Sequence, residues 1–277
     1  MDLLLLSDPF DPSMHFDPFD LIFAVARGIC RRVAASTQPS IEGALGLLYP
    51  AWCQACDGRH AHPSEGYVCR ECQGKLRLVA PPFCRRCGLP YPGAISDSFD
   101  CENCRDTRFH FEFARAASVA NPFLMDLIHR YKYRDAQWLE PYFIRVLTRQ
   151  ASPFLLRTEW DVIVPVPLHP IRRRERGFNQ AERLARPLAL ATGIPLNTQL
   201  VRRIERTNTQ TALSRVARTK NVRNAFERLS DTRLDGLACV VFDDVLTTGA
   251  TTSAVAKILK NSGAARVCVW SLARAAY

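Results

Sequence analysis

The stretch VVFDDVLTTGATT, at residues 240–252, constrains the fold of this chain more than any other segment. The apolar, β-branched run at 239–242 predicts a strand that is covered on both faces. Asp243 and Asp244 follow at the carboxyl end of that strand, where open α/β sheets bind their ligands. A turn rich in threonine comes next, and 252–260 has the composition of a helix. This order of parts predicts an α/β fold with a ligand site at one end of the sheet.

The turn has the chemistry of an anion site. It offers hydroxyl groups, small side chains and a glycine that lets the backbone approach a ligand, from Thr247, Thr248, Gly249, Ala250 and Thr251. The free N–H groups and the positive dipole end of the following helix would point at a phosphate. An ordinary strand–turn–helix with a threonine cap is the alternative, but it leaves the two adjacent carboxylates unexplained. We therefore expect a pocket for a sugar phosphate.

The segment resembles the phosphoribosyl pyrophosphate (PRPP) signature of type I phosphoribosyltransferases at all thirteen positions. The resemblance implies that Asp243 and Asp244 are the catalytic pair and hold the ribose hydroxyls, and that 247–251 binds the 5′-phosphate. It also implies that Mg²⁺ binds together with PRPP. Strands alternate with helices over 113–277, so we predict a phosphoribosyltransferase-like domain there, with a mostly parallel sheet and flanking helices.

Eight of the 11 cysteines form Cys-x2-Cys pairs, a spacing that indicates metal binding. Two pairs complete a tetrahedral site of four thiolates, so we predict two structural Zn²⁺ ions in a double zinc-ribbon module at 49–107. Sequential pairing is simpler, although a cross-braced arrangement uses the same residues. A disulfide framework is the alternative, and it requires an oxidising compartment. The predicted ligands are Cys53, Cys56, Cys69 and Cys72 for one site, and Cys84, Cys87, Cys101 and Cys104 for the other.

Basic residues gather near the predicted pocket. One run follows a strand predicted at 161–167 and consists of Arg172, Arg173, Arg174 and Arg176. Because a guanidinium fork suits phosphate oxygens, we expect this run to hold a pyrophosphate, and a solvated charged face is the alternative. Upstream, Lys132 lies in a predicted helix at 123–133 whose cations form either a basic lip over the pocket or a solvated face.

Residues 202–228 are basic, polar and without apolar periodicity until their end. A long loop inside a compact domain is often an active-site lid, and type I phosphoribosyltransferases have a flexible catalytic loop in this part of the chain. We expect Arg218 to reach the pyrophosphate from this loop, and a surface hairpin or a helix is the alternative. The other residues expected on or near it are Thr209, Gln210, Leu213, Ser214 and Asn221.

The charge of the chain indicates anionic ligands. There are 37 Lys and Arg against 27 Asp and Glu, a formal net charge of +10, which suits nucleotides and nucleic acids alike. No apolar run reaches the about 18 residues of a membrane span. The first segment is acidic before its apolar stretch, unlike a secretory signal. We therefore expect a cytoplasmic protein with no membrane insertion.

Paired zinc ribbons before a PRPP signature, with LIHRYKYRD and RRRERGFNQ between them, resemble the ComF/GntX family over about residues 49–275. Residues 1–48 depart from that family, and we expect an N-terminal extension that is partly disordered or forms a short helix. The resemblance implies PRPP binding and, in competence systems, a role with incoming single-stranded DNA and helicase-type competence proteins. Two functions stay open. One is phosphoribosyl transfer, with release of pyrophosphate, to an acceptor that the sequence does not declare. The other is a non-catalytic accessory protein that binds PRPP and single-stranded DNA during DNA uptake.

Overall fold

The structure is a computed structural model that describes residues 51–91, 93, 99–105, 107–205 and 224–275. The chain divides into two compact units, Met1–Ala51 and Trp52–Tyr277, and every helix and strand given below belongs to the second. The extension expected at 1–48 therefore lies outside the described residues, as do residues 206–223 of the predicted lid, with Arg218, Thr209, Gln210, Leu213, Ser214 and Asn221.

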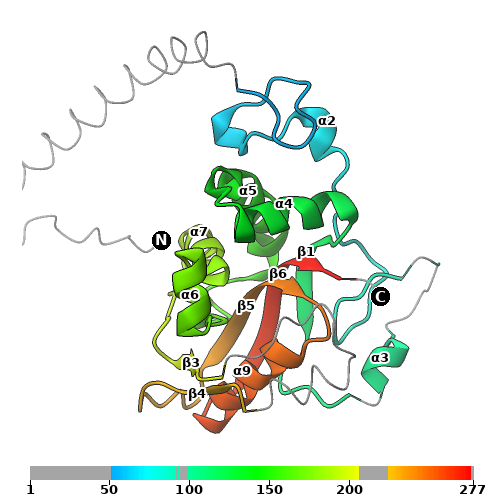
Figure 1. The fold of residues 1–277 in the computed structure, drawn as a ribbon. Coiled ribbons are helices and arrows are strands. Elements are labelled where there is room, and N and C mark those ends of the chain that lie inside the picture. The colour runs from blue at the N-terminus through cyan, green and yellow to red at the C-terminus, as the bar shows by residue number, and fades with distance from the viewer. Residues whose placement is uncertain (1–50, 92, 94–98, 106, 206–223, 276–277) are drawn as a thin grey trace, which may run out of the picture. The chain divides into compact units, whose positions relative to one another are not determined.

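A parallel sheet forms the centre of this unit (Figure 1). Its strands lie in the order β1-β6-β5-β2, and each neighbouring pair is parallel. They span Ala114–Val119 (β1), Arg266–Arg274 (β6), Ala238–Leu246 (β5) and Val162–Pro165 (β2). Helices flank the sheet, so the predicted fold class is confirmed.

The two faces of β5 are buried against different helices. Val240 and Phe242 share one core with α4 (Pro122–Tyr133), α5 (Glu140–Ala151) and α7 (Gln180–Thr192). Cys239 and Val241 share a second core with α9 (Ala250–Asn261). Side chains of a strand alternate between the faces of its sheet, so a continuous apolar run such as 239–242 fits burial on both sides. Figure 1 shows these helices around the sheet.

Local signals explain where the long helices begin. Asn121 Oδ1 accepts a hydrogen bond from the N–H of Leu124, and Pro122 occupies the first turn of α4, where a missing N–H costs nothing. Asn179 caps α7 in the same way, since its Oδ1 accepts from the N–H of Ala181 at 3.1 Å. Both caps place the helix starts within the range that the sequence predicts.

Shorter elements complete the unit. The helices are α2 (Arg70–Gln73), α3 (Glu102–Arg105) and α6 (Pro170–Arg176), with 3-10 turns at Pro63–Glu65 (η1), Gln137–Leu139 (η2) and Ser152–Phe154 (η3). An antiparallel ribbon pairs β3 (Val201–Arg203) with β4 (Phe226–Arg228), on either side of 206–223. Within the described ranges no helix has the length and apolarity to cross a bilayer.

Two boundaries differ from the sequence expectation. Strand β5 continues to Leu246, so the acidic pair lies inside the strand instead of after it. The reason is β6, which runs on to Arg274 and keeps β5 extended, with Asp243 opposite Ser271. Helix α9 begins at Ala250, so Ala250 and Thr251 belong to its first turn, and the turn proper is residues 247–249.

Candidate functional site

The acidic pair lies close to the carboxyl end of β5, between β6 and β2. Its carboxylates are held by the strand itself. Asp243 Oδ1 accepts from the N–H of Asp244, and Asp244 Oδ1 accepts from the N–H of Val245, each at 2.9 Å. These bonds leave the second oxygen of each carboxylate for other partners.

Lys132, in the last turn of α4, supplies one of those partners. Its Nζ forms an ion pair with Asp244 Oδ2, and the two side chains are only 18% and 12% exposed. Burial raises the pKa of Asp244, but the Lys132 ammonium outweighs it and holds that pKa below its ordinary value. Burial and the neighbouring Asp244 charge raise the pKa of Asp243. The pair is thus asymmetric, with a stabilised anion at Asp244 and a disfavoured one at Asp243.

The residues after β5 form a tight turn into α9. Gly249 has φ +77°, in the left-handed region that favours glycine. Thr248 Oγ1 accepts from the N–H of Ala250 at 3.3 Å, and the Thr252 hydroxyl donates to the Gly249 carbonyl at 3.1 Å. Because the first turn of a helix leaves N–H groups without intrahelical partners, this start of α9 is suited to an anion.

The arginine run lies on α6, which follows β2. The parallel pairing sets Pro165 of β2 opposite Phe242 of β5, so β2 ends beside the residue that precedes the acidic pair. The charge of Arg176 lowers the pKa of Asp244, and Arg172, four residues earlier, acts together with Arg176 on the pKa of Arg203. These two arginines face the same region as the acidic pair.

The other two arginines of the run face outward. Arg173 is 60% exposed and pairs with Glu182 at 3.6 Å. Arg174 is also exposed. Residues four positions apart lie on the same side of a helix, and the residues between them point elsewhere. Helix α6 therefore divides the run into an inner pair, Arg172 and Arg176, and an outer pair, Arg173 and Arg174. The sequence expectation treated all four alike.

Two residues near the acidic pair were not singled out from the sequence. Arg203, on β3, stacks over the Phe226 ring at 5.3 Å; burial lowers its pKa, and the nearby Asp243 acts in the opposite direction. Tyr133 lies under the Arg176 guanidinium at 4.7 Å and its hydroxyl accepts from Arg176 Nη2 at 2.7 Å. Both occur in stretches that the sequence marks as basic, but their approach depends on how β3 and α4 pack.

The cysteines gather into two clusters in sequential pairing, and not in the cross-braced arrangement. In each cluster the ligand atoms all lie within 4.8 Å of one another. The Sγ–Sγ distance is 3.9 Å between Cys56 and Cys69, and 3.6 Å between Cys87 and Cys101. A tetrahedron with Zn–S bonds of about 2.3 Å has edges of ~3.8 Å, so both clusters fit Zn²⁺.

Hydrogen bonds to the cysteine sulfurs, and the absence of disulfides among the described residues, agree with metal binding. Backbone N–H groups of Cys69 and Cys101 donate to Cys53 Sγ and Cys84 Sγ, each at 3.3 Å. All cysteines in the described ranges are free, so the disulfide alternative is wrong there. Four thiolates would leave neither site an open coordination position, so both clusters suit structural Zn²⁺. Cys239 and Cys268 are buried in the sheet, as expected.

Comparison with known proteins agrees with this architecture. A family described as the double zinc ribbon domain matches residues 44–106. DNA utilization protein YhgH of Salmonella typhimurium is 34% identical over 231 residues, which cover 82% of this chain and 99% of that protein. Competence protein F of Haemophilus influenzae is 31% identical over 229 residues, 80% of this chain and 96% of that protein.

Similarity to solved structures is weaker. A hypoxanthine phosphoribosyltransferase from Staphylococcus aureus matches 48% of this chain and 63% of its own, at a TM-score of 0.33 and 10% identity. A phosphoribosylpyrophosphate synthetase from Mycobacterium smegmatis matches 47% of this chain and 33% of its own, at a TM-score of 0.29 and 19% identity. The chain thus spans less than two thirds of either protein, and likenesses of this size carry no functional argument.

Sequence relatedness is decisive, since it extends over nearly the whole length of the curated relatives. Competence protein ComFC of Bacillus subtilis adds a third, 30% identical over 219 residues, 75% of this chain and 84% of that protein. The chain belongs to the ComF family of competence and DNA utilization proteins.

Proposed function

We propose that this protein binds PRPP at the carboxyl end of β5. The acidic pair takes the ribose hydroxyls, and the turn at 247–249 with the first turn of α9 takes the 5′-phosphate. The observation that carries the proposal is the acidic pair itself, which stands on a buried strand two residues before a glycine turn that opens a helix. Among the described residues only Asp244 of the pair has an ion pair, with Lys132, so a salt bridge does not account for the second carboxyl group.

The charges around the pair fit the rest of the ligand. Hydroxyl groups of a ribose would replace Lys132 as donors to Asp244 Oδ2. The released ammonium, with the inner arginines Arg172 and Arg176 and with Arg203, would then balance the pyrophosphate. Charge-assisted hydrogen bonds of this kind are about twice as strong as neutral ones, so these cations supply both affinity and orientation.

Mg²⁺ fits this site as a companion of the ligand. Among the described residues, groups of three or more potential metal ligands occur only at the two cysteine clusters. A magnesium ion at the acidic pair would therefore take most of its oxygen ligands from PRPP, as it commonly does at phosphate sites. When bound, it neutralises charge on the pyrophosphate.

We propose phosphoribosyl transfer as the reaction. The bond from C1 of the ribose to the pyrophosphate oxygen breaks with its electron pair on the oxygen, and an acceptor forms the new bond at C1. The chain's residues contribute position and charge, with the Asp244 carboxylate near a ribose ring that becomes positive and cations near the leaving group. The acceptor is not assigned.

Calorimetric titration with PRPP and Mg²⁺ tests the proposal. We expect wild-type protein to bind, and the Asp243→Asn/Asp244→Asn variant to bind at least about tenfold more weakly, the equivalent of ~1.4 kcal/mol. Asp126→Asn, which changes a 63% exposed carboxylate on α4, is the matched control and should leave the affinity unchanged. Absence of PRPP binding by the wild type, or equal affinity of the double variant, would refute the proposal.

A second function is favoured by the relatives, which are named for competence and DNA utilization. It is a non-catalytic accessory role in which the protein binds PRPP and single-stranded DNA. The net charge of +10 suits it, because phosphate neutralisation supplies most non-specific affinity for nucleic acids. Release of pyrophosphate from PRPP on addition of an acceptor, lost in the double variant, favours the enzyme. PRPP binding without turnover across a panel of bases favours the accessory role.

A further inference from the structure

Arg274, at the end of β6, joins the second cysteine cluster to the turn after β5. Its side chain is buried, with 2% of the residue exposed. On one side Nε donates to the Cys87 carbonyl at 2.9 Å and Nη2 to Cys87 Sγ at 3.3 Å. On the other side Nη1 donates to the carbonyls of Leu246, at 3.2 Å, and Thr247, at 2.8 Å. One guanidinium thus spans from a predicted zinc ligand to the predicted phosphate turn.

The charge of Arg274 needs a partner. The acceptors of its hydrogen bonds are backbone carbonyls and a cysteine sulfur, none of them a carboxylate. A buried cation without a counter-charge is costly. A zinc ion held by four thiolates carries a formal charge of −2, and Cys87 is one of those thiolates. A loaded second site would therefore supply a counter-charge for Arg274.

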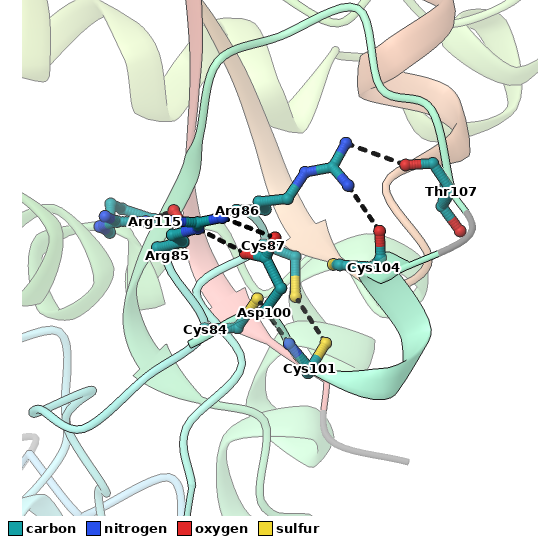
Figure 2. A network of polar contacts seen from close by, with 9 residues as sticks. All are labelled: Cys84, Arg85, Arg86, Cys87, Asp100, Cys101, Cys104, Thr107 and Arg115. Carbon is teal, nitrogen blue, oxygen red and sulfur yellow. Dashed lines mark hydrogen bonds and ion pairs between the residues drawn. The ribbon is translucent and has the colours of Figure 1, made fainter. Parts of the chain in front are cut away.

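Aromatic contacts join the same two parts. A Cβ built on Gly249 would lie 3.1 Å from the Phe109 ring, which stacks on Phe111 at 4.6 Å. Arg86, between the ligands Cys84 and Cys87, lies over the Phe109 ring at 5.5 Å. Its guanidinium donates to the carbonyls of Cys104 and Thr107 (Figure 2). The loop of the second cluster thus packs directly against the glycine of the turn.

Two more observations place the second cluster against this end of the molecule. The Ser253 hydroxyl, in the first turn of α9, accepts from the N–H of His110 at 3.1 Å. A small cavity is lined from both sides, by Cys87 and Cys104 of the cluster, by Thr247 and Thr248 of the turn, and by Asn103, Phe109 and Arg274. A change in the cluster therefore reaches the turn through side chains that touch both.

The first cluster has a different neighbour and serves as a built-in reference. Its loop packs on α5, where a Cβ on Gly66 would lie 2.7 Å from the Tyr142 nitrogen. Arg145 Nη2, also on α5, donates to the Glu65 carbonyl at 3.5 Å. Cys53, Cys69 and Cys72 belong to the core on the face opposite α9.

We propose that the second zinc site and the phosphate turn form one coupled unit, with Arg274 as the positioning residue between them. Loading of the second site fixes the turn and raises the affinity for the phosphate end of the ligand, and a bound ligand in return stabilises zinc at that site. When zinc leaves, Cys87 is no longer held by the metal, and Arg274 loses a fixed partner on that side. The carbonyls of Leu246 and Thr247 then lose a fixed donor, and binding must pay the entropy of ordering the turn. The identity of the ligand rests on the proposed function, whereas the coupling itself does not.

Hydrogen exchange tests the coupling without any ligand. The measurement uses full-length protein in zinc-containing buffer. We expect amide exchange in 246–251 to be about fivefold faster or more in Cys104→Ser, which loses one ligand of the second site, than in wild type. A factor of about five is the lower end of typical coupling between sites. Cys72→Ser, at the first site, should leave exchange in that segment unchanged. Equal exchange in Cys104→Ser and wild type, or the same increase in Cys72→Ser, would overturn the proposal.

A conservative pair of variants guards against simple misfolding of the ribbon. Arg274→Lys keeps the charge but loses the fork, so exchange in 246–251 should rise while both zinc ions stay bound. Arg115→Lys is the matched control: Arg115 stacks over Phe83 at 4.7 Å and donates to the Arg85 carbonyl at 3.0 Å, beside the same cluster. It should not change exchange in 246–251. If amide exchange in 246–251 is the same in Arg274→Lys as in wild type, Arg274 has no positioning role.

Reciprocity gives a second readout. We expect PRPP with Mg²⁺ to slow chelator-driven release of one of the two zinc ions by about fivefold or more, namely the ion that Cys104→Ser lacks, and Arg274→Lys to abolish this protection. If PRPP binds wild type yet both ions leave at unchanged rates, the coupling is refuted. If PRPP does not bind at all, the proposed function fails, and the exchange measurements still decide the coupling.

Discussion

At the scale of single residues, one lysine sets the charge state of the candidate site. Asp243 and Asp244 are adjacent carboxylates in a buried strand, and their pKa values move in opposite directions. The difference arises because Lys132 Nζ lies on Asp244 Oδ2. Sequence alone placed Lys132 on a helix with a basic end. It could not show the ion pair, because that depends on where the last turn of α4 ends relative to β5.

Lys132→Met should destabilise the fold in a pH-dependent way. Removing one member of a buried charged pair leaves the other charge without a partner, at a cost of about 3–5 kcal/mol. The pKa of Asp244 lies below its unfolded value, so pairing with Lys132 stabilises the wild type above that value and is lost as pH falls through the lowered pKa. In the variant the Lys132 charge is gone, so burial is opposed only by the Asp243 hydrogen bond and the Arg176 charge, and the pKa of Asp244 rises relative to wild type. The loss of stability should therefore be largest near pH 8 and shrink as the pH falls through the raised pKa.

Urea unfolding at pH 8 and at pH 5.5, in zinc-containing buffer, measures this difference. Arg130→Met is the matched control on the same helix, since Arg130 pairs at 3.7 Å with Asp126, which is 63% exposed. An exposed pair contributes less than about 1 kcal/mol, with little dependence on pH in this range. A Lys132→Met effect of equal size at both pH values would contradict the role assigned to Lys132.

At the scale of elements, the strand–turn–helix unit is the part that sequence predicts best. The apolar run at 239–242 and the helical composition after the turn are local signals, and they give β5 and α9 to within a few residues. The predictions are wrong where contacts with a neighbouring element determine the structure. Strand β5 is longer than its apolar run because β6 pairs with it as far as Leu246 opposite Arg274. The arginines of α6 divide into inner and outer pairs because the run is helical.

Gly249→Ala should impair the turn more than its backbone conformation alone requires. Gly249 has φ +77°, and Gly193, after α7, has φ +70°. An alanine at either position lowers the stability by about 1–2 kcal/mol, because the left-handed conformation is unfavourable for it. A Cβ at Gly193 meets nothing within 4 Å, whereas one at Gly249 meets the Phe109 ring at 3.1 Å. Gly193→Ala is therefore the matched control for the conformational cost.

Thermal unfolding and PRPP titration of the two variants separate the effects. We expect similar losses of stability from the backbone and a further loss in Gly249→Ala, because Phe109 must move. PRPP affinity should fall only in Gly249→Ala. Equal affinity in both variants would show that the shape of the turn does not matter to the ligand.

At the scale of the whole molecule, strand order decides which distant segments meet. The order β1-β6-β5-β2 brings the end of β6 beside the end of β5, and the second cysteine cluster beside both. Cysteine spacing predicted the zinc clusters because their ligands are close in sequence. The link through Arg274 joins residues 187 positions apart, and no periodicity or spacing reports it. Local chemistry was therefore predictable from sequence, and the connection between the two sites was not.

Charge is also a property of the whole molecule, and it leads to a prediction about nucleic acid. With a net charge of +10, the protein should bind single-stranded DNA with an affinity that falls as salt rises. The outward-facing Arg173 and Arg174 can contact DNA phosphates, Arg173 by exchanging its ion pair with Glu182, while Arg172 and Arg176 face the acidic pair. Replacing two phosphate contacts should reduce the slope of log affinity against log salt by ~1.4, at about 0.7 per contact.

Fluorescence anisotropy with a labelled oligothymidylate, on wild type and Arg173→Gln/Arg174→Gln, measures this slope. PRPP titration of the same variant is the control and should match wild type, since the outer pair lies away from the ribose site. If the variant keeps the wild-type slope, or if it loses PRPP affinity instead, the division of α6 into two functional sides is wrong.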